Sequence, residues 1–133
     1  MEYGCIGEHL SHSFSKEIHN KIASYNYEIC EVAKEELEEF MLKREFKAIN
    51  VTIPYKETVI QYLDELDHIA KEIGAVNTIK FQRKNGRTSL KGYNTDIIGF
   101  TNSIAPQLQK VHDKALILGT GGASKAIAFA LEK

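Results

Sequence analysis

The sequence predicts an α/β fold: a three-layer domain with a mixed, mostly parallel sheet and helices on both faces, followed by a truncated strand–turn–helix unit. Three observations lead to this prediction. Short apolar runs alternate with amphipathic ones over the first fifty residues, Asn85-Gly86 separates two strand-like runs, and a glycine-rich turn follows an apolar run near the C-terminus. Strand–helix alternation implies right-handed crossovers between parallel strands, whereas Asn-Gly is the strongest short hairpin signal and adds an antiparallel pair.

The spacing of apolar residues and the residues that start or stop each run define the individual elements. Strands are predicted at 2–7, 27–32, 48–53, 76–83, 88–93 and 114–118. Helices are predicted at 34–44, 56–62, 65–72, 95–104 and from the glycine turn to Lys133. A further helix has Ser15 as its N-cap and carries Ile18, Ile22 and Ala23 on one face. Pro54 ends the third strand because proline has no N–H to donate, and Gly74 is a plausible helix terminator.

Composition and charge exclude several classes of protein. The 133 residues carry 17 basic and 18 acidic side chains, and no basic stripe interleaved with aromatic residues is present, so no nucleic-acid partner is expected. No apolar run is long enough to cross a bilayer, so no membrane partner is expected. The N-terminus lacks the basic start and apolar core of a signal peptide, which favours a cytoplasmic protein.

Polar side chains gather where three of the predicted strands end. Residues 11–15 follow the first strand, residues 50–56 cover the end of the third, and Asn94-Thr95-Asp96 follows the second arm of the hairpin. Ligands of open α/β sheets bind outside the carboxyl ends of the strands, so these segments are expected to converge on one pocket. Taken singly, each serine, Asn94 or Asp96 is more often a helix cap, and Lys56 a solvated charge. Together they suit a small polyhydroxylated acid.

Four sequence blocks resemble the shikimate dehydrogenase family, in the order that the family has them. They are Gly7–Asn20, which holds the Ser-x-Ser pair, Asn50–Lys56, which holds the lysine motif, Gly74–Ile79 and Gly92–Gly99. The resemblance runs from about Tyr3 to Leu131. The family pattern usually has proline where His9 and Lys16 stand, and neither departure removes a residue that carries chemistry.

The resemblance implies an NADP-dependent oxidoreductase of the shikimate pathway, which makes aromatic amino acids by way of chorismate. The reaction it implies is the reversible reduction of 3-dehydroshikimate to shikimate. Lys56 and Asp96 would be the catalytic pair, with Lys56 ranked first and the base of the oxidation direction left open between them. The residues implied to bind the substrate are Ser13 and Ser15 at its carboxylate and Thr52, Lys56, Asn77 and Asp96 at its ring hydroxyls.

The C-terminal run Leu116–Ala126 has the strand, glycine turn and helix start that a dinucleotide site requires, with Ser124 at the usual third glycine. By the resemblance, Gly119, Gly121, Gly122 and Ala123 would belong to an NADP site. Residues 1–104 are then expected to form the shikimate-binding catalytic domain. Residues 105–133 are expected to hold a linker and a truncated Rossmann βα unit.

An incomplete cofactor half has two expected consequences. The residue that contacts the ribose lies about twenty positions past the glycine turn, which falls beyond Lys133. This polypeptide is therefore expected to bind shikimate weakly, if at all, and to turn over nothing measurable. The apolar run 114–118 would be a strand without its sheet, and such an edge favours self-association.

Three rival interpretations remain open. The first is a quinate/shikimate dehydrogenase with a different choice of substrate or of NAD against NADP. The second is a non-catalytic shikimate-binding module, against which Lys56 and Asp96 argue. The third is the methylenetetrahydrofolate dehydrogenase family, which also joins a lysine-bearing domain to a dinucleotide-binding half. The Ser-x-Ser and Asn-Thr-Asp blocks favour the shikimate family.

Overall fold

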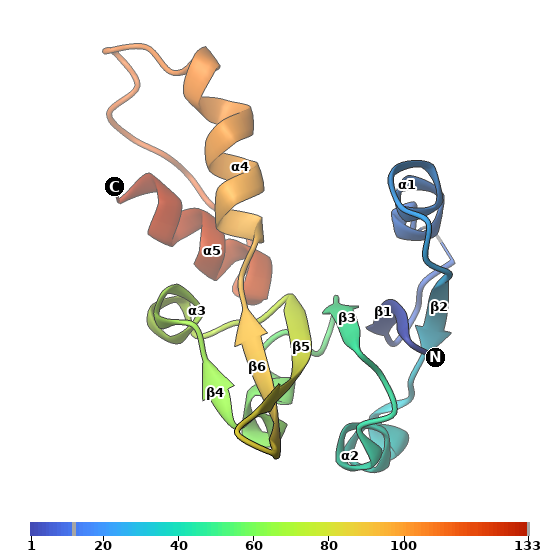
Figure 1. Cartoon of the computed structure of the whole chain (residues 1–133). Coiled ribbons are helices and arrows are strands. Elements are labelled where there is room, and N and C mark those ends of the chain that lie inside the picture. Colours follow the sequence, from blue (N-terminus) through green and yellow to red (C-terminus); the bar gives the residue numbers. More distant parts are fainter. Residues whose placement is uncertain (12, 133) are drawn as a thin grey trace.

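The computed structural model describes residues 1–11 and 13–132. Its strands form one six-stranded sheet in the order β2-β1-β3-β5-β6-β4 (Figure 1). The strands are β1 (Tyr3–Gly7), β2 (Tyr27–Glu31), β3 (Ala48–Val51), β4 (Glu65–Leu66), β5 (Thr78–Lys84) and β6 (Arg87–Tyr93). The helices are α1 (Ser15–Ile22), α2 (Lys34–Lys43), η1 (Thr58–Tyr62), α3 (His68–Ile73), α4 (Asp96–Ile104), η2 (Ala105–Gln107) and α5 (Gly122–Leu131).

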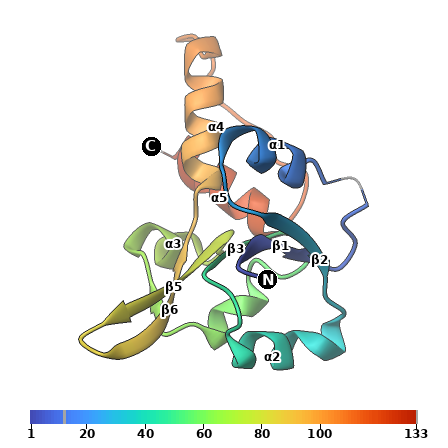
Figure 2. The same cartoon turned by 45° about the vertical axis from the view of Figure 1, so that its right-hand side comes forward.

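Five strands of the sheet point the same way, and only β5 runs against them. β1 pairs in parallel with β2 and β3, β5 is antiparallel to both β3 and β6, and β4 is parallel to β6. The predicted mixed, mostly parallel α/β sheet is therefore confirmed. Asn85 and Gly86 turn the chain between β5 and β6 with φ of 54° and 76°, and this hairpin projects from the body of the molecule (Figure 2).

Side chains of each strand alternate between two faces of the sheet. One face carries the main core, in which Ile6, Ile49 and Val51 pack with Leu37 and Met41 of α2. The opposite face carries a smaller cluster of Cys5, Leu10 and Tyr27. α1 and α2 lie on opposite sides of β1 and β2 (Figure 1), so helices cover both faces as predicted.

The predicted buried strand at 114–118 is wrong. These residues form no strand, and Leu116 and Leu118 are 85% and 89% exposed. The run is apolar as a strand would be, but none of the six described strands lies alongside it to supply backbone hydrogen bonds. The turn and helix that follow it are formed, because α5 begins at Gly122.

Two details of α1 also differ from the prediction. Ser15 is its first helical residue rather than its N-cap, and the cap position is held by Phe14, without a side-chain hydrogen bond. Ser13 contributes instead, because its Oγ accepts the N–H of Ser15 at 3.3 Å. Ile18 and Ile22, which were predicted on one apolar face of this helix, are 54% and 74% exposed, and α1 has no buried residue.

Three boundaries shift by a few residues. The third strand ends at Val51, two residues before the predicted end, and the segment predicted as a helix at 56–62 is a 3₁₀ helix. The segment predicted as a helix at 65–72 divides into β4 and α3, because Asp67 caps α3 by accepting the N–H of Ile69. Gly74 ends α3 in the left-handed conformation, as predicted. Among the described residues, no helix combines the length and apolar character that a bilayer crossing requires.

Asp64 fastens the chain ahead of β4 to β6. Its Oδ2 accepts the backbone N–H of Leu90 at 2.8 Å and a guanidinium N–H of Arg44 at 2.9 Å. These two donors favour the charged carboxylate, and the Leu90 N–H is the larger reason that the pKa of Asp64 lies below its ordinary value of 3.8.

We expect Asp64→Asn to lower the free energy of unfolding at pH 7 by about 0.5–1 kcal/mol, since a half-exposed carboxylate is partly screened by water. Because the pKa of Asp64 is lower in the folded protein than in the unfolded one, its carboxylate stabilises the fold at pH values above the unfolded-state pKa. This stabilisation is lost as the pH falls through the folded-state pKa. Urea titrations of both proteins between pH 7 and pH 2.5 check this. A stability difference that persists unchanged at the acid end contradicts it.

Candidate active site

The sheet topology brings three distant segments to one edge. Asn50 of β3 lies opposite Thr78 of β5, and Thr78 lies opposite Tyr93 of β6. The ends of β3 and β6 therefore lie at the same edge as the start of β5. Thr52–Lys56 continues from β3, and Asn94–Asp96 continues from β6, so both arrive beside Asn77.

Alternation places the polar members of these strands on the face away from the main core. Ile49 and Val51 point into the main core, so Asn50 between them points to the other face. Ile79 likewise packs in the main core, and its neighbour Thr78 points the opposite way. The amide of Asn50 donates to Oγ1 of Thr78 at 3.2 Å, so the polar side chains of β3 and β5 are hydrogen-bonded to each other on this face.

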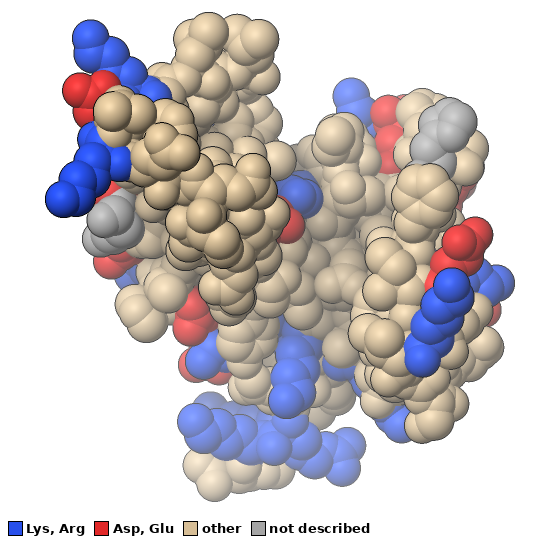
Figure 3. Space-filling view, turned by 90° about the horizontal axis from the view of Figure 1, so that it is seen from above, with Lys and Arg blue, Asp and Glu red and all other residues tan. Residues whose placement is uncertain are grey.

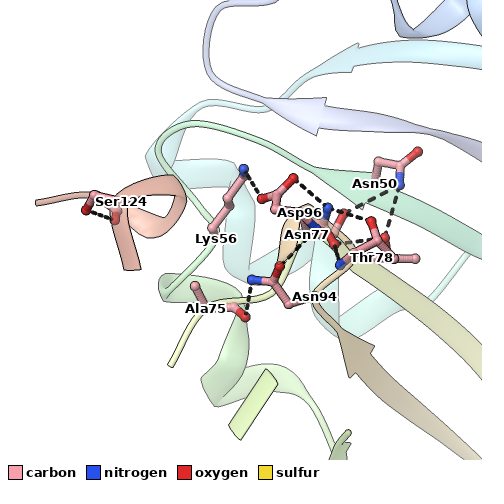
Figure 4. A network of polar contacts seen from close by, with 10 residues as sticks. Asn50, Lys56, Ala75, Asn77, Thr78, Asn94, Asp96 and Ser124 are labelled. Carbon is pink, nitrogen blue, oxygen red and sulfur yellow. Dashed lines mark hydrogen bonds and ion pairs between the residues drawn. The ribbon is translucent and has the colours of Figure 1, made fainter. Parts of the chain in front are cut away.

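Lys56 and Asp96 form an ion pair at the centre of the site. The Lys56 Nζ lies 2.7 Å from Oδ2 of Asp96, and the two side chains are 14% and 33% exposed (Figure 4). Asp96 is held by Asn94, whose Oδ1 accepts the N–H of Asp96 at 3.0 Å and whose amide donates to the carbonyl of Ala75. Asn94 is only 5% exposed, so this anchor is largely shielded from water.

Asn77 engages the second oxygen of the same carboxylate. Its Nδ2 donates to Oδ1 of Asp96 at 3.0 Å (Figure 4). The same Nδ2 donates to Oγ1 of Thr95 at 2.8 Å. Its Oδ1 accepts from the N–H of Thr95 and from the hydroxyl of Thr78. Both oxygens of Asp96 thus have fixed partners, which sets the plane of the carboxylate and the position of the Lys56 ammonium.

Two adjoining cavities lie over these groups. One has a volume of about 280 Å³ and is lined by Cys5, Ser15, Asn50, Val51, Thr52, Lys56, Asn77 and Asp96. The second, of about 450 Å³, shares Cys5, Ser15 and Thr52 with it and adds Ser13. These two cavities together are the polar hollow of the site, and all six residues predicted to bind a substrate line one or the other. Seen from above, the molecule is hollowed between the lobe of α4 and α5 and the lobe of α1, with acidic and basic side chains at its base (Figure 3).

The glycine turn lies beside Lys56, the basic member of this ion pair. A cavity of about 520 Å³ is lined by Lys56 together with Gly119, Gly121, Gly122 and Ala123, the four residues predicted for a dinucleotide. Gly122 begins α5 and packs directly on the lysine: a Cβ placed there would lie 2.7 Å from Cβ of Lys56. Lys125 of α5 also pairs with Glu57 at 3.1 Å. Lys56 thus separates a hydroxyl- and amide-lined hollow from a glycine-lined one.

Sequence reasoning missed Cys5 and Tyr27, and it placed Asn50 and Asn94 in the converging polar segments without giving either a role. Asn50 gave one signal, because it is the polar residue inside an otherwise apolar strand. Tyr27 and Cys5 gave none, since both are ordinary strand residues and their position on the polar face depends on register. His12, part of the predicted polar segment, lies outside the described residues.

These features define an α/β domain with a polar hollow beside a glycine turn of the dinucleotide-binding type. Comparison with known proteins gives its family. Residues 5–79 match the family described as the shikimate dehydrogenase substrate binding domain. The chain belongs to this family. The shikimate dehydrogenase (NADP(+)) of Aquifex aeolicus is 44% identical over 140 residues, which cover 98% of this chain and 51% of that protein.

Solved structures agree with the sequence comparison. Shikimate dehydrogenase 1 from Peptoclostridium difficile has a TM-score of 0.87 and 39% identity, covering 99% of this chain and 51% of that one. Shikimate 5-dehydrogenase from Thermus thermophilus, in complex with NADP(H) and shikimate, has a TM-score of 0.81 and 32% identity, covering 99% and 52%. The chain spans about half the length of the relatives it matches.

The contact between Gly122 and Lys56 yields a test of how α5 is held. We expect Gly122→Ala to push the start of α5 away from Lys56, because the clash is with Cβ, which lies next to the backbone and has little freedom to move. Amide chemical shifts should change around Lys56, Ala75 and α5 and stay constant in the main core.

Gly99→Ala in α4 is the matched control. Nothing lies within 4 Å of a Cβ at Gly99, so alanine should stabilise the helix by about 0.5–1 kcal/mol. Equal stability changes and equally local shifts in both variants would contradict the close packing of Gly122 on Lys56.

Proposed function

We propose that this chain is the substrate-binding part of an NADP-dependent shikimate dehydrogenase, an oxidoreductase that reversibly reduces 3-dehydroshikimate to shikimate. Residues 1–104 form its substrate domain, and residues 105–133 hold a linker and the start of its cofactor domain. One observation carries the proposal: the Lys56–Asp96 pair stands between a hollow suited to a polyhydroxylated acid and a glycine turn suited to a dinucleotide. The family of the chain and the activity for which its relatives are named support it.

The substrate lies along the hollow, with its carboxylate at the serines. The hydroxyl of Ser15 and the region of Ser13 line the end of the hollow away from Lys56. The cationic end, with Lys56, Asp96, Asn77 and Thr52, offers donors and acceptors to ring hydroxyls and to the carbonyl. A carboxylate at the serines is also kept apart from the Asp96 charge.

Lys56 supplies the proton in the reduction. When bound, NADPH supplies the hydride, which adds to the carbonyl carbon and leaves the electron pair on the oxygen. The Lys56 ammonium stabilises that developing negative charge and transfers a proton from Nζ to the oxygen, which completes the hydroxyl. Asp96 fixes the ammonium in position, and Asn77 fixes Asp96. In the oxidation direction the proton returns to this pair, with Lys56 the first candidate base and Asp96 the second.

The residues of the glycine turn fit a dinucleotide. Gly121 precedes α5 and contributes no side-chain cap, so the first N–H groups of the helix have no side-chain acceptor at that position. Backbone N–H groups at a helix start favour a pyrophosphate, and glycines let it approach closely. Gly119, Gly121, Gly122 and Ala123 would hold it there, on the far side of Lys56 from the substrate.

We expect Lys56→Met to abolish shikimate binding while keeping the fold. Methionine retains the stem that packs on Gly122 but leaves the Asp96 carboxylate without its cation and the ring hydroxyls without a donor. NMR titration of the 133-residue polypeptide with shikimate should show weak, saturable shifts around Ser15, Asn77 and Asp96 in the wild type and none in the variant.

Lys110→Met, in an exposed turn, is the control and should bind as the wild type does. The polypeptide alone should show no measurable oxidation of NADPH by 3-dehydroshikimate, since it spans about half the length of its relatives. Wild-type shifts that never appear, or that occur away from the hollow, would sink the proposal.

Self-association through the segment 114–118 is a second expected property of this polypeptide. Leu116 and Leu118 are 85% and 89% exposed and stand beside an apolar hollow lined by Phe100, Ile104 and Ile127. Contiguous exposed apolar surface favours association. Light scattering at rising concentration should show a mass above that of one chain, and the double variant Leu116→Glu, Leu118→Glu should return it to one chain. A wild type that stays monomeric contradicts this.

A further inference from the structure

α1 carries Ser15 and follows Ser13, yet none of its residues is buried. His19 makes the aromatic contact between α1 and the sheet. The His19 ring stacks on the ring of Tyr27 at a centroid distance of 3.9 Å and an angle of 7°. Nδ1 of His19 is also hydrogen-bonded to the hydroxyl of Tyr25 at 2.7 Å, and Tyr25 stacks on Tyr3 at 4.5 Å. The aromatic stack, rather than apolar burial of Ile18 and Ile22, therefore sets the position of the serine-bearing helix.

Tyr27 extends this connection into the polar network. Its side chain is 2% exposed, and its hydroxyl donates to Oδ1 of Asn50 at 2.8 Å. Asn50 donates to Thr78, Thr78 donates to Asn77, and Asn77 donates to Asp96, which pairs with Lys56. The donors of this series all point in one direction, from the tyrosine to the ion pair (Figure 4 shows it from Asn50 onward).

The hydroxyl of Tyr27 remains a donor throughout the neutral range. Burial raises its pKa, the neighbouring Cys5 thiol adds to the shift, and the Ser15 hydroxyl opposes it. These neighbours also locate the hydroxyl, because Cys5 and Ser15 both line the hollow that holds Lys56 and Asp96. Tyr27 thus lies under the floor of the hollow, between the serine end and the network that leads to the ion pair.

We propose that Tyr27 is a positioning residue of this site: its ring holds the serine-bearing helix through His19, and its hydroxyl holds the Asn50–Thr78–Asn77–Asp96–Lys56 network. One side chain thereby sets the separation between the group that receives the substrate carboxylate and the groups that receive its ring hydroxyls. This inference rests on the proposed function and deepens it, since it assigns the residue that fixes the length of acid the hollow accepts.

Two variants separate the two roles. Tyr27→Phe keeps the ring stack and removes the hydroxyl, which leaves Oδ1 of Asn50 without its donor. His19→Leu removes the stack and leaves the hydroxyl of Tyr27 in place. Two probe ligands match them: shikimate, and its methyl ester, which lacks the carboxylate charge but keeps the three ring hydroxyls.

We expect Tyr27→Phe to raise the dissociation constants of both ligands by about three- to tenfold, which corresponds to the loss of one buried hydrogen bond. We expect His19→Leu to raise the dissociation constant of shikimate by a similar factor. It should raise that of the ester by less than half of that factor, because binding of the ester depends less on Ser13 and Ser15. General loosening of the fold would weaken both ligands equally in both variants, so the difference between ligands separates positioning from a structural effect. Equal losses in His19→Leu, or unchanged binding in Tyr27→Phe, overturn the inference.

A ligand-free measurement keeps this test apart from that of the proposed function. Side-chain amide resonances of Asn50 and Asn77 should both shift in Tyr27→Phe, because the network passes from one to the other. Tyr62→Phe, which packs against the main core on the other face, should leave them unchanged. If the amides shift and the wild type binds no shikimate, the proposed function fails; if shikimate binds and the Asn77 amide does not respond, the inference alone fails.

Discussion

The antiparallel strand β5 is the constraint on which this site depends. It lies between β3 and β6, and by running against both it places its own start beside their ends. A parallel strand there would bring its far end to that edge and would leave Asn77 at the opposite side of the sheet. The reversed strand lets Lys56 and Asp96, forty residues apart in the chain, meet at 2.7 Å. The hairpin turn at Asn85-Gly86 therefore sets the geometry of the candidate site as well as the fold.

Electrostatics explains why the ion pair is surrounded by so many amides. Removing a lysine and an aspartate from water costs several kcal/mol each, and the attraction between them offsets this only if their remaining hydrogen-bonding atoms have partners. Asn77 supplies this partner for the Asp96 carboxylate, and Asn94 holds the same residue by accepting its backbone N–H. The pair stays partly exposed, at 14% and 33%, toward the hollow. It is thus stable without a ligand, and its open side faces the space that a ligand would occupy.

The sequence allowed much of this arrangement to be predicted, because the strongest signals were local. The alternation of apolar and amphipathic runs identified the sheet, the Asn-Gly turn identified the hairpin, and Gly74 identified the end of α3. Family motifs named six site residues, and all six line the two adjoining cavities: Ser13, Ser15, Thr52, Lys56, Asn77 and Asp96. What failed depended on tertiary context. The run at 114–118 has strand composition but no neighbouring strand, and Ile18 and Ile22 have helical spacing but face away from the sheet. Tyr27 could not be selected, because only the register of β2, β1 and β3 reveals that it lies on the same face as Asn50.

The absence of a Cβ at Gly122 lets the start of α5 restrict the movement of Lys56. An exposed lysine samples many rotamers, and ordering it costs about 2 kcal/mol in side-chain entropy. Here the stem lies against the start of α5, with Cβ and Cδ both within contact of that position, while Asp96 holds the tip. Folding therefore immobilises Lys56 before any ligand arrives, and binding has no such loss left to overcome. Because Gly122 of α5 has no side chain, it can pack closely on Lys56 and preorganise the ammonium of that residue.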